Sequence, residues 1–158
     1  MRQAISNLVA MRETEGSNIY GDFIKRADLI AEKLAVIEER SPQVVEEYQI
    51  RLSDRINELL AKHNQVIEPE RLLQEVAIFA DRTSITEEIV RLKSHIKQFR
   101  LIIDADQPVG RKLDFLIQEF NREANTIASK ANDYTLAQVV VEIKAEIEKI
   151  REQIQNIE

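Results

Sequence analysis

The chain has 158 residues, of which 44% are hydrophobic and 32% charged, and its formal net charge is −6. This length suffices for one domain with its own core, or for an elongated array of long helices. Three glycines and three prolines are too few for an all-β or α/β fold, which needs a turn about every ten residues. We therefore expect an all-α protein.

Residue types and runs that are missing restrict the chemistry and the compartment. The chain has no cysteine, which excludes a disulfide framework and any thiolate metal site. No run approaches the ~18 apolar residues of a membrane span, and the polar N-terminus lacks a signal-peptide pattern. We expect a soluble, cytoplasmic protein with no membrane partner.

Residues 1–83 are predicted to form long helices. Apolar residues recur there at alternating steps of four and three, the spacing of one helix face. They are Phe23, Ala27, Ile30, Leu34 and Ile37. Ser41 and Pro42 are typical of an N-cap and a first helical position, so we expect a kink or a break near residues 41–42. A loop is predicted near residues 63–69, with Pro69 opening the next helix.

Residues 84–158 carry the clearest helix signals. A capping box at Ser84-Ile-Thr-Glu87 predicts a helix start, and the turn-rich linker at residues 104–110 leads into a second helix. Asn132 and Asp133 end that helix, and a last heptad series follows. The predicted fold is an elongated antiparallel bundle of about five or six long helices with a C-terminal helical hairpin, forming one structural unit.

Charge is unevenly distributed along the chain. A net charge of −6 argues against a generic nucleic-acid binder, whose affinity depends on neutralising phosphates. Residues 89–103 nevertheless contain no acid, whereas the tail from residue 131 is acidic. The basic residues of this stretch and of the start of the next helix are Arg91, Lys93, His95, Lys97, Arg100, Arg111 and Lys112. We expect them to hold phosphates despite the acidic total.

The polar surface of residues 110–131 differs from that of an ordinary solvated helix. One flank combines Arg111, Asp114, Gln118, Asn121, Arg122, Asn125 and Ser129; the other combines Lys112, Glu119, Glu123, Thr126 and Lys130. Asn, Ser, Thr and Asp are mediocre helix formers, so a solvated helix rarely gathers them. Such residues contact phosphates and riboses, but amides also fix the register between helices or subunits. Both interpretations stay open.

A second group of residues suits metal binding or proton transfer. Glu88, Arg91 and His95 follow a line beside the apolar seam, at the boundary between core and solvent. Glu119 and Glu123 are four residues apart, and they repel unless a cation lies between them. Because the linker is short, we expect His95 and Glu88 to lie beside the two glutamates. Alternatively, these acids and bases merely neutralise one another across helix interfaces.

Four segments together carry a family pattern: Met11-Arg-Glu-Thr-Glu-Gly16, Thr86-Glu-Glu-Ile-Val-Arg-Leu-Lys-Ser-His95, the whole of residues 110–133, and residues 146–158. They resemble the C-terminal half of the YicC/YloC family of bacterial endoribonucleases over essentially all 158 residues. Family members have a further N-terminal domain, so we expect this chain to be a fragment. Ser84 departs from the family's Asp-x-Thr-Glu-Glu pattern, so a role for that acid does not transfer.

The resemblance implies a metal-dependent endoribonuclease that cleaves RNA by hydrolysis or transesterification. It further implies a link to RNA turnover and stress, and a homohexamer that encloses RNA. Within the matching motif, we assign catalysis to Glu88, His95, Glu119 and Glu123, with a divalent ion (Mg²⁺ or Mn²⁺) on His95, Glu119 and Glu123. We assign RNA binding to Arg91, Arg111, Lys112, Arg122, Asn121 and Asn125. The alternative is a non-enzymatic helical oligomerisation or RNA-gripping module, with catalysis on the missing domain.

Overall fold

The computed structural model describes residues 2–62, 68–105 and 109–155, and these ranges contain helices and no strand. The helices are α1 (Arg2–Ala61), α2 (Pro69–Arg82), α3 (Thr86–Ile103), α4 (Gly110–Lys130) and α5 (Tyr134–Gln155). The all-α prediction is confirmed. None of these helices is long and apolar enough to cross a membrane.

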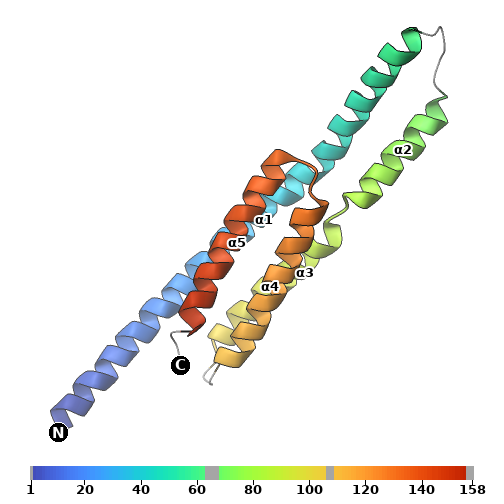
Figure 1. Cartoon of the computed structure of the whole chain (residues 1–158). Coiled ribbons are helices and arrows are strands. Elements are labelled where there is room, and N and C mark those ends of the chain that lie inside the picture. Colours follow the sequence, from blue (N-terminus) through green and yellow to red (C-terminus); the bar gives the residue numbers. More distant parts are fainter. Residues whose placement is uncertain (1, 63–67, 106–108, 156–158) are drawn as a thin grey trace.

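Four of the helices form an elongated bundle (Figure 1). Neighbouring helices run in opposite directions around the ring α1, α3, α4, α5, and α1 closes the ring by packing against both α3 and α5. The C-terminal hairpin is confirmed, since α4 and α5 pack together across a turn at residues 131–133. Beyond the bundle, α2 pairs with the C-terminal part of α1 as a two-helix arm.

The core consists of apolar seams at the predicted heptad spacing. Residues from both halves of the sequence, such as Phe23 and Ile143, share one hydrophobic cluster. An aromatic series crosses the cluster. The rings of Phe23 and Phe99 lie 5.5 Å apart edge to face, and those of Phe99 and Phe120 lie 5.9 Å apart. In the arm, Val76 is the buried residue of α2, and Tyr48 stacks on Phe79.

Of the kink or break predicted at residues 41–42, the break does not occur, because α1 continues through Pro42. The proline has no N–H to donate to the carbonyl of Glu38, and a helix accommodates that loss by bending more readily than by ending when its flanks are packed. Leu34, Ile37 and Val44 are buried on either side of it. Tertiary packing therefore overrides the local stop signal. Most of the predicted loop, residues 63–67, lies outside the described residues, and Pro69 opens α2 as expected.

The predicted capping box is also wrong in detail. The N-cap of α3 is Ile85, and no side chain caps the helix. Ser84 instead donates its N–H to the carbonyl of Asp81, at the end of α2. Ile85 is buried in the core, which draws the short connection inward and leaves Ser84 exposed. Glu87 is hydrogen-bonded to Arg91 rather than to the helix start.

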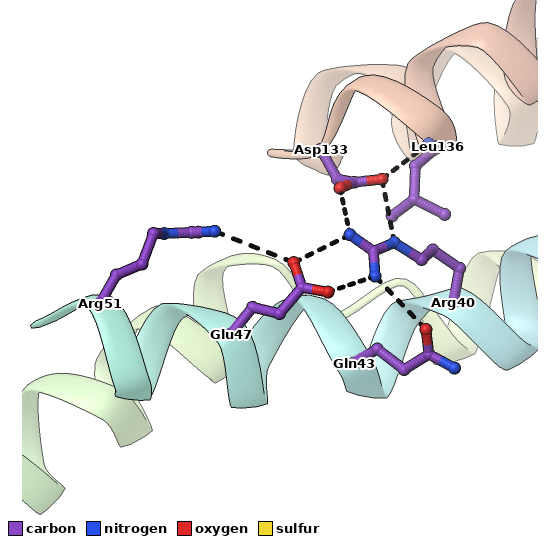
Figure 2. A network of polar contacts seen from close by, with 6 residues as sticks. All are labelled: Arg40, Gln43, Glu47, Arg51, Asp133 and Leu136. Atoms are coloured by element: carbon purple, nitrogen blue, oxygen red, sulfur yellow. Dashed lines mark hydrogen bonds and ion pairs between the residues drawn. The ribbon is translucent and has the colours of Figure 1, made fainter.

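A polar network ties the α4–α5 turn to α1 (Figure 2). The guanidinium of Arg40 contacts both carboxylate oxygens of Glu47, at 2.5 and 2.9 Å, and both of Asp133, at 3.3 and 2.7 Å. Asp133 also accepts the backbone N–H of Leu136 at 2.9 Å, so it caps α5. Arg40 and Glu47 lie on opposite sides of Pro42, and their contact spans the proline. The network therefore holds both the hairpin turn and the part of α1 from which the arm extends.

The Asp133 carboxylate should make stability depend on pH. Hydrogen bonds from Arg40 hold the pKa of Asp133 below its usual value, although burial raises it. This stabilisation is complete above the unfolded pKa of about 3.9 and is lost as the pH falls through the lower folded value. In urea titrations, Asp133→Asn should be less stable than the native chain at pH 7, and the gap should narrow below pH ~4.

Two further variants separate the two roles of Asp133. Asp133→Ala also loses the cap and should be less stable than Asp133→Asn by about 1 kcal/mol. Glu142→Gln removes an exposed ion pair with Lys33 and should change stability by less than ~0.5 kcal/mol. Equal stability of Asp133→Asn and the native chain at pH 7 would show that the ion pair contributes nothing.

Candidate metal centre

Three potential metal ligands converge between α3 and α4. His95 of α3 and Glu119 and Glu123 of α4 each offer a ligand atom, and these atoms lie within 4.8 Å of one another. Glu123 is buried, while His95 and Glu119 are half-buried. The spacing of four residues places both glutamates on the same side of α4. The expected meeting of His95 with the two glutamates is found. We call these three residues the triad.

Packing holds the imidazole of His95 in place. Its ring lies on that of Phe120, with centroids 6.2 Å apart, and Phe120 is fully buried against Phe99. Nδ1 of His95 is buried and has no hydrogen-bond partner in the described part of the chain. A buried polar atom without a partner costs about 1–3 kcal/mol. An additional group that satisfies the imidazole would therefore stabilise the folded chain, and a metal ion with its bound waters is such a group.

Two arginines form only weak ion pairs with the carboxylates of the triad. Nη1 of Arg91 lies 3.8 Å from Oε1 of Glu123, and Nη1 of Arg122 lies 3.7 Å from Oε2 of Glu119. These separations exceed hydrogen-bond length, so both are weak ion pairs. Arg91 also bonds Glu87. The two carboxylates thus retain lone pairs for a divalent cation, which attracts them more strongly than the distant guanidinium groups do.

Glu88 does not belong to the triad, contrary to our expectation. It lies two helical turns before His95, about 10 Å along the axis of α3. Its Oε1 accepts a 2.7 Å hydrogen bond from Lys130, while its Oε2 is buried without a partner in the described residues. Burial raises the pKa of Glu88, but Lys130 and the other nearby hydrogen bonds and charges together lower it below its usual value. Glu88 is therefore an ionised partner of Lys130.

A hollow of about 370 Å³ opens beside the triad, between α3 and α4. It is lined by His95, Gln98, Ile102, Arg111, Lys112, Phe115, Leu116 and Glu119. Two of these belong to the triad, so a molecule in the hollow would touch two potential metal ligands. Arg111 and Lys112 are exposed, and neither forms an ion pair with another residue that the structure describes. The hollow therefore presents positive charge next to the triad.

Two residues of the predicted basic stretch form ion pairs with α1. Lys93 contacts Glu38 of α1 at 2.6 Å, and Arg100 contacts Asp28 of α1 at 2.5 Å. These pairs join α3 to α1, so the acid-free stretch in the sequence is partly neutralised in space. Of the basic residues without such a pair, Arg111 and Lys112 line the hollow beside the triad and are therefore the clearest candidates for phosphate contacts.

The amide flank of α4 faces a second hollow, of about 500 Å³, which extends toward α5. Gln118, Asn121, Arg122, Asn125 and Arg151 are among the residues that line it. Asn121 and Asn125 make no side-chain hydrogen bond within the described ranges. Their donors and acceptors are thus not used to join helices of one chain. This favours a ligand or a partner as the reason for the amides.

Sequence reasoning missed Phe115 and Gln98. Phe115 is 64% exposed in the wall of the first hollow, although it is a large apolar side chain. One signal was available: Phe115 lies outside the stripe formed by Leu113, Leu116 and Phe120, so the helix period already places it on the surface. No sequence signal distinguishes Gln98 from an ordinary solvated glutamine.

The fold and site define an antiparallel helical bundle with a groove-side cluster of carboxylates and imidazole. The chain belongs to the family described as "Endoribonuclease YicC-like, C-terminal", whose model matches residues 37–158. It is 52% identical over 158 residues to the "Probable endoribonuclease YicC" of Clostridioides difficile (strain 630), covering 100% of this chain and 54% of that protein.

A second relative is the "Probable endoribonuclease YicC" of Haemophilus influenzae (strain ATCC 51907 / DSM 11121 / KW20 / Rd). It is 38% identical over 154 residues, which cover 98% of this chain and 52% of that protein. The chain spans about half the length of the curated relatives it matches.

If the triad binds a divalent cation, the cation should stabilise the folded chain. Mn²⁺ at 100 times its dissociation constant should add about 2.7 kcal/mol, measured as a rise in melting temperature. Glu123→Gln and His95→Ala should abolish the rise. Glu88→Gln is the matched control, because Glu88 is also a buried glutamate at the α3–α4 interface but lies outside the triad. An equal rise in all variants would place the binding elsewhere.

Proposed function

We propose that this chain is the C-terminal part of a metal-dependent endoribonuclease, and that cleavage takes place at the triad. The observation that carries the proposal is the position of His95, Glu119 and Glu123 beside a hollow lined by Arg111 and Lys112. Phosphodiester cleavage needs both features. The triad would activate a nucleophile near the scissile phosphate, and the two cations would compensate the negative charge that develops on that phosphate.

Each group has a distinct task in this proposal. Arg111 and Lys112 hold the phosphate against the triad, and Arg122 and Arg91 add positive charge at its edge. Asn121 and Asn125 bind riboses or base edges through the second hollow. Glu119 and His95 line the first hollow and therefore reach the substrate. A bound divalent ion supplies Lewis-acid stabilisation of the phosphate and lowers the pKa of an attacking water or 2′-OH.

The donor set suits Mn²⁺ better than Mg²⁺. Two carboxylates and one imidazole provide one nitrogen and several oxygens, and leave other positions for water or substrate. Mg²⁺ is the harder ion and takes oxygen ligands almost exclusively. We propose Mn²⁺ as the preferred activator and Mg²⁺ as a weaker one.

The names of the two relatives support the reaction class, and the match to half their length leaves room for a second candidate function. In that alternative, this chain is an RNA-gripping or oligomerisation module, and catalysis resides in an N-terminal domain. In either case we propose RNA as the partner, a homohexamer as the assembly, and the cytoplasm and stress responses as the setting.

Cleavage of labelled RNA, with and without EDTA, tests the two candidates. The assay should use the 158-residue chain beside the longer protein that the resemblance implies. His95→Ala and Glu119→Gln should each abolish cleavage while folding and RNA binding are retained, whereas Glu88→Gln should still cleave. If both triad variants cut RNA at the native rate, cleavage does not take place at the triad. If only the longer protein cuts RNA, the module function is favoured.

Salt dependence tests the phosphate contacts separately. For single-stranded RNA, each neutralised phosphate contributes about 0.7 to the slope of log K against log salt concentration. The double variant Arg111→Ala/Lys112→Ala should therefore bind RNA more weakly, with a slope reduced by about 1.4. Lys93→Ala/Arg100→Ala removes the same charge from residues paired with α1 and should leave the slope nearly unchanged. Equal slopes for the two double variants would contradict the assignment.

A further inference from the structure

We propose that Phe115 is a stacking platform for one unpaired nucleotide, bound in the hollow between α3 and α4 immediately beside the triad. The proposal rests on RNA as the substrate and deepens the proposed function. It specifies that the enzyme acts on a strand whose base is free to leave its own stack.

Phe115 is unusual among the apolar residues of α4. The residues of the seam, including Leu113, Leu116 and Phe120, are at most 3% exposed, whereas Phe115 is 64% exposed. It shares the wall of the hollow with His95 and Glu119. Single exposed apolar residues are common on protein surfaces. Phe115 differs in lying in the wall of a hollow beside two residues of the triad, where its ring face is open to a bound molecule.

The size of the hollow limits its occupant. About 370 Å³ lies near the lower end of the range for small-molecule sites, roughly 300–1,000 Å³, so the hollow has room for one nucleotide. In an A-form duplex the base faces are covered by their neighbours, and a protein reaches only edges, riboses and phosphates. A base that stacks on Phe115 must therefore come from a single strand, a bulge or a frayed end.

The charge of the hollow favours RNA over a protein partner. Arg111 and Lys112 line it without an ion pair among the described residues, while the centre of a protein interface is usually depleted of charge. Two cations beside one aromatic ring match a nucleotide, which carries an anionic phosphate and a flat base. Phenylalanine has no hydrogen-bonding group, so the platform accepts every base. Gln98 contributes an amide to the wall, and its donor and acceptor can add a preference for one base edge.

The chain contains no tryptophan, so Phe115→Trp introduces a single tryptophan at the platform, which can be excited apart from the three tyrosines. In EDTA, which stops a metal-dependent cleavage, a 10-nucleotide single-stranded RNA should quench its emission, and the same sequence as a duplex should quench it much less. Val141→Trp is the matched control, because Val141 is 67% exposed on α5 and does not line the hollow. No quenching of Phe115→Trp, or equal quenching of the two variants, overturns the proposal.

Affinity gives a second readout. Phe115→Leu keeps an apolar side chain but removes the ring face, and it should weaken binding of the single strand roughly tenfold while duplex binding is unchanged. Phe115→Tyr should bind as the native chain does. Native affinity of Phe115→Leu would overturn the proposal. If the oligomer mass measured by light scattering also falls, Phe115 is a subunit contact instead. Because these measurements need no metal, failure of the metal site and failure of the platform are distinguishable.

Discussion

The antiparallel pairing of α3 and α4 is the constraint on which the candidate site depends. The seam residues Leu92, Ile96 and Phe99 interlock with those of α4 and fix the relative height of the two helices. At that height Glu88 meets Lys130, and seven residues later His95 meets the two glutamates. A slip of one helical turn would displace these partners by about 5.4 Å and disperse the triad. The apolar core thus sets the geometry of the polar groups.

Most of this architecture could be predicted from the heptad spacing of the apolar residues and from the polar residues that flank each apolar seam. The heptad seams, the C-terminal hairpin and the meeting of His95 with Glu119 and Glu123 follow from helix period and a short linker. Local signals failed where packing decides: Pro42 does not end α1, and Ser84 does not cap α3. The expectation for Glu88 is wrong because a shared boundary line gives a shared side of α3 and not a shared height: the seven-residue spacing already separates Glu88 from His95 by about 10 Å along the helix axis.

Ion pairs explain why the acidic total of the chain does not exclude RNA. Acids of α1 take up Lys93 and Arg100, and the buried Glu146 of α5 is held by Arg26 and Lys149. Part of the formal charge is therefore neutralised by neighbouring side chains, at the exposed edges of α1 and α3 and, for Glu146, in the buried contact between α1 and α5. The field that a phosphate meets is set instead by the few cations left at the hollow, and the net charge is a poor guide to it.

The position of α4 in the bundle explains why this helix can contain so many Asn, Ser and Thr residues. Packing against α3 on one side and α5 on the other stabilises it as a helix, so it tolerates Asn, Ser and Thr that an isolated helix would not. The triad lies on its α3 side and the amide hollow on its α5 side. Arg122, which is paired loosely with Glu119 and also lines the amide hollow, lies between them. In the proposed function, a strand that crosses α4 therefore meets a guanidinium as it passes from one hollow to the other. One helix presents both the reacting site and the surface that holds the flanking nucleotides.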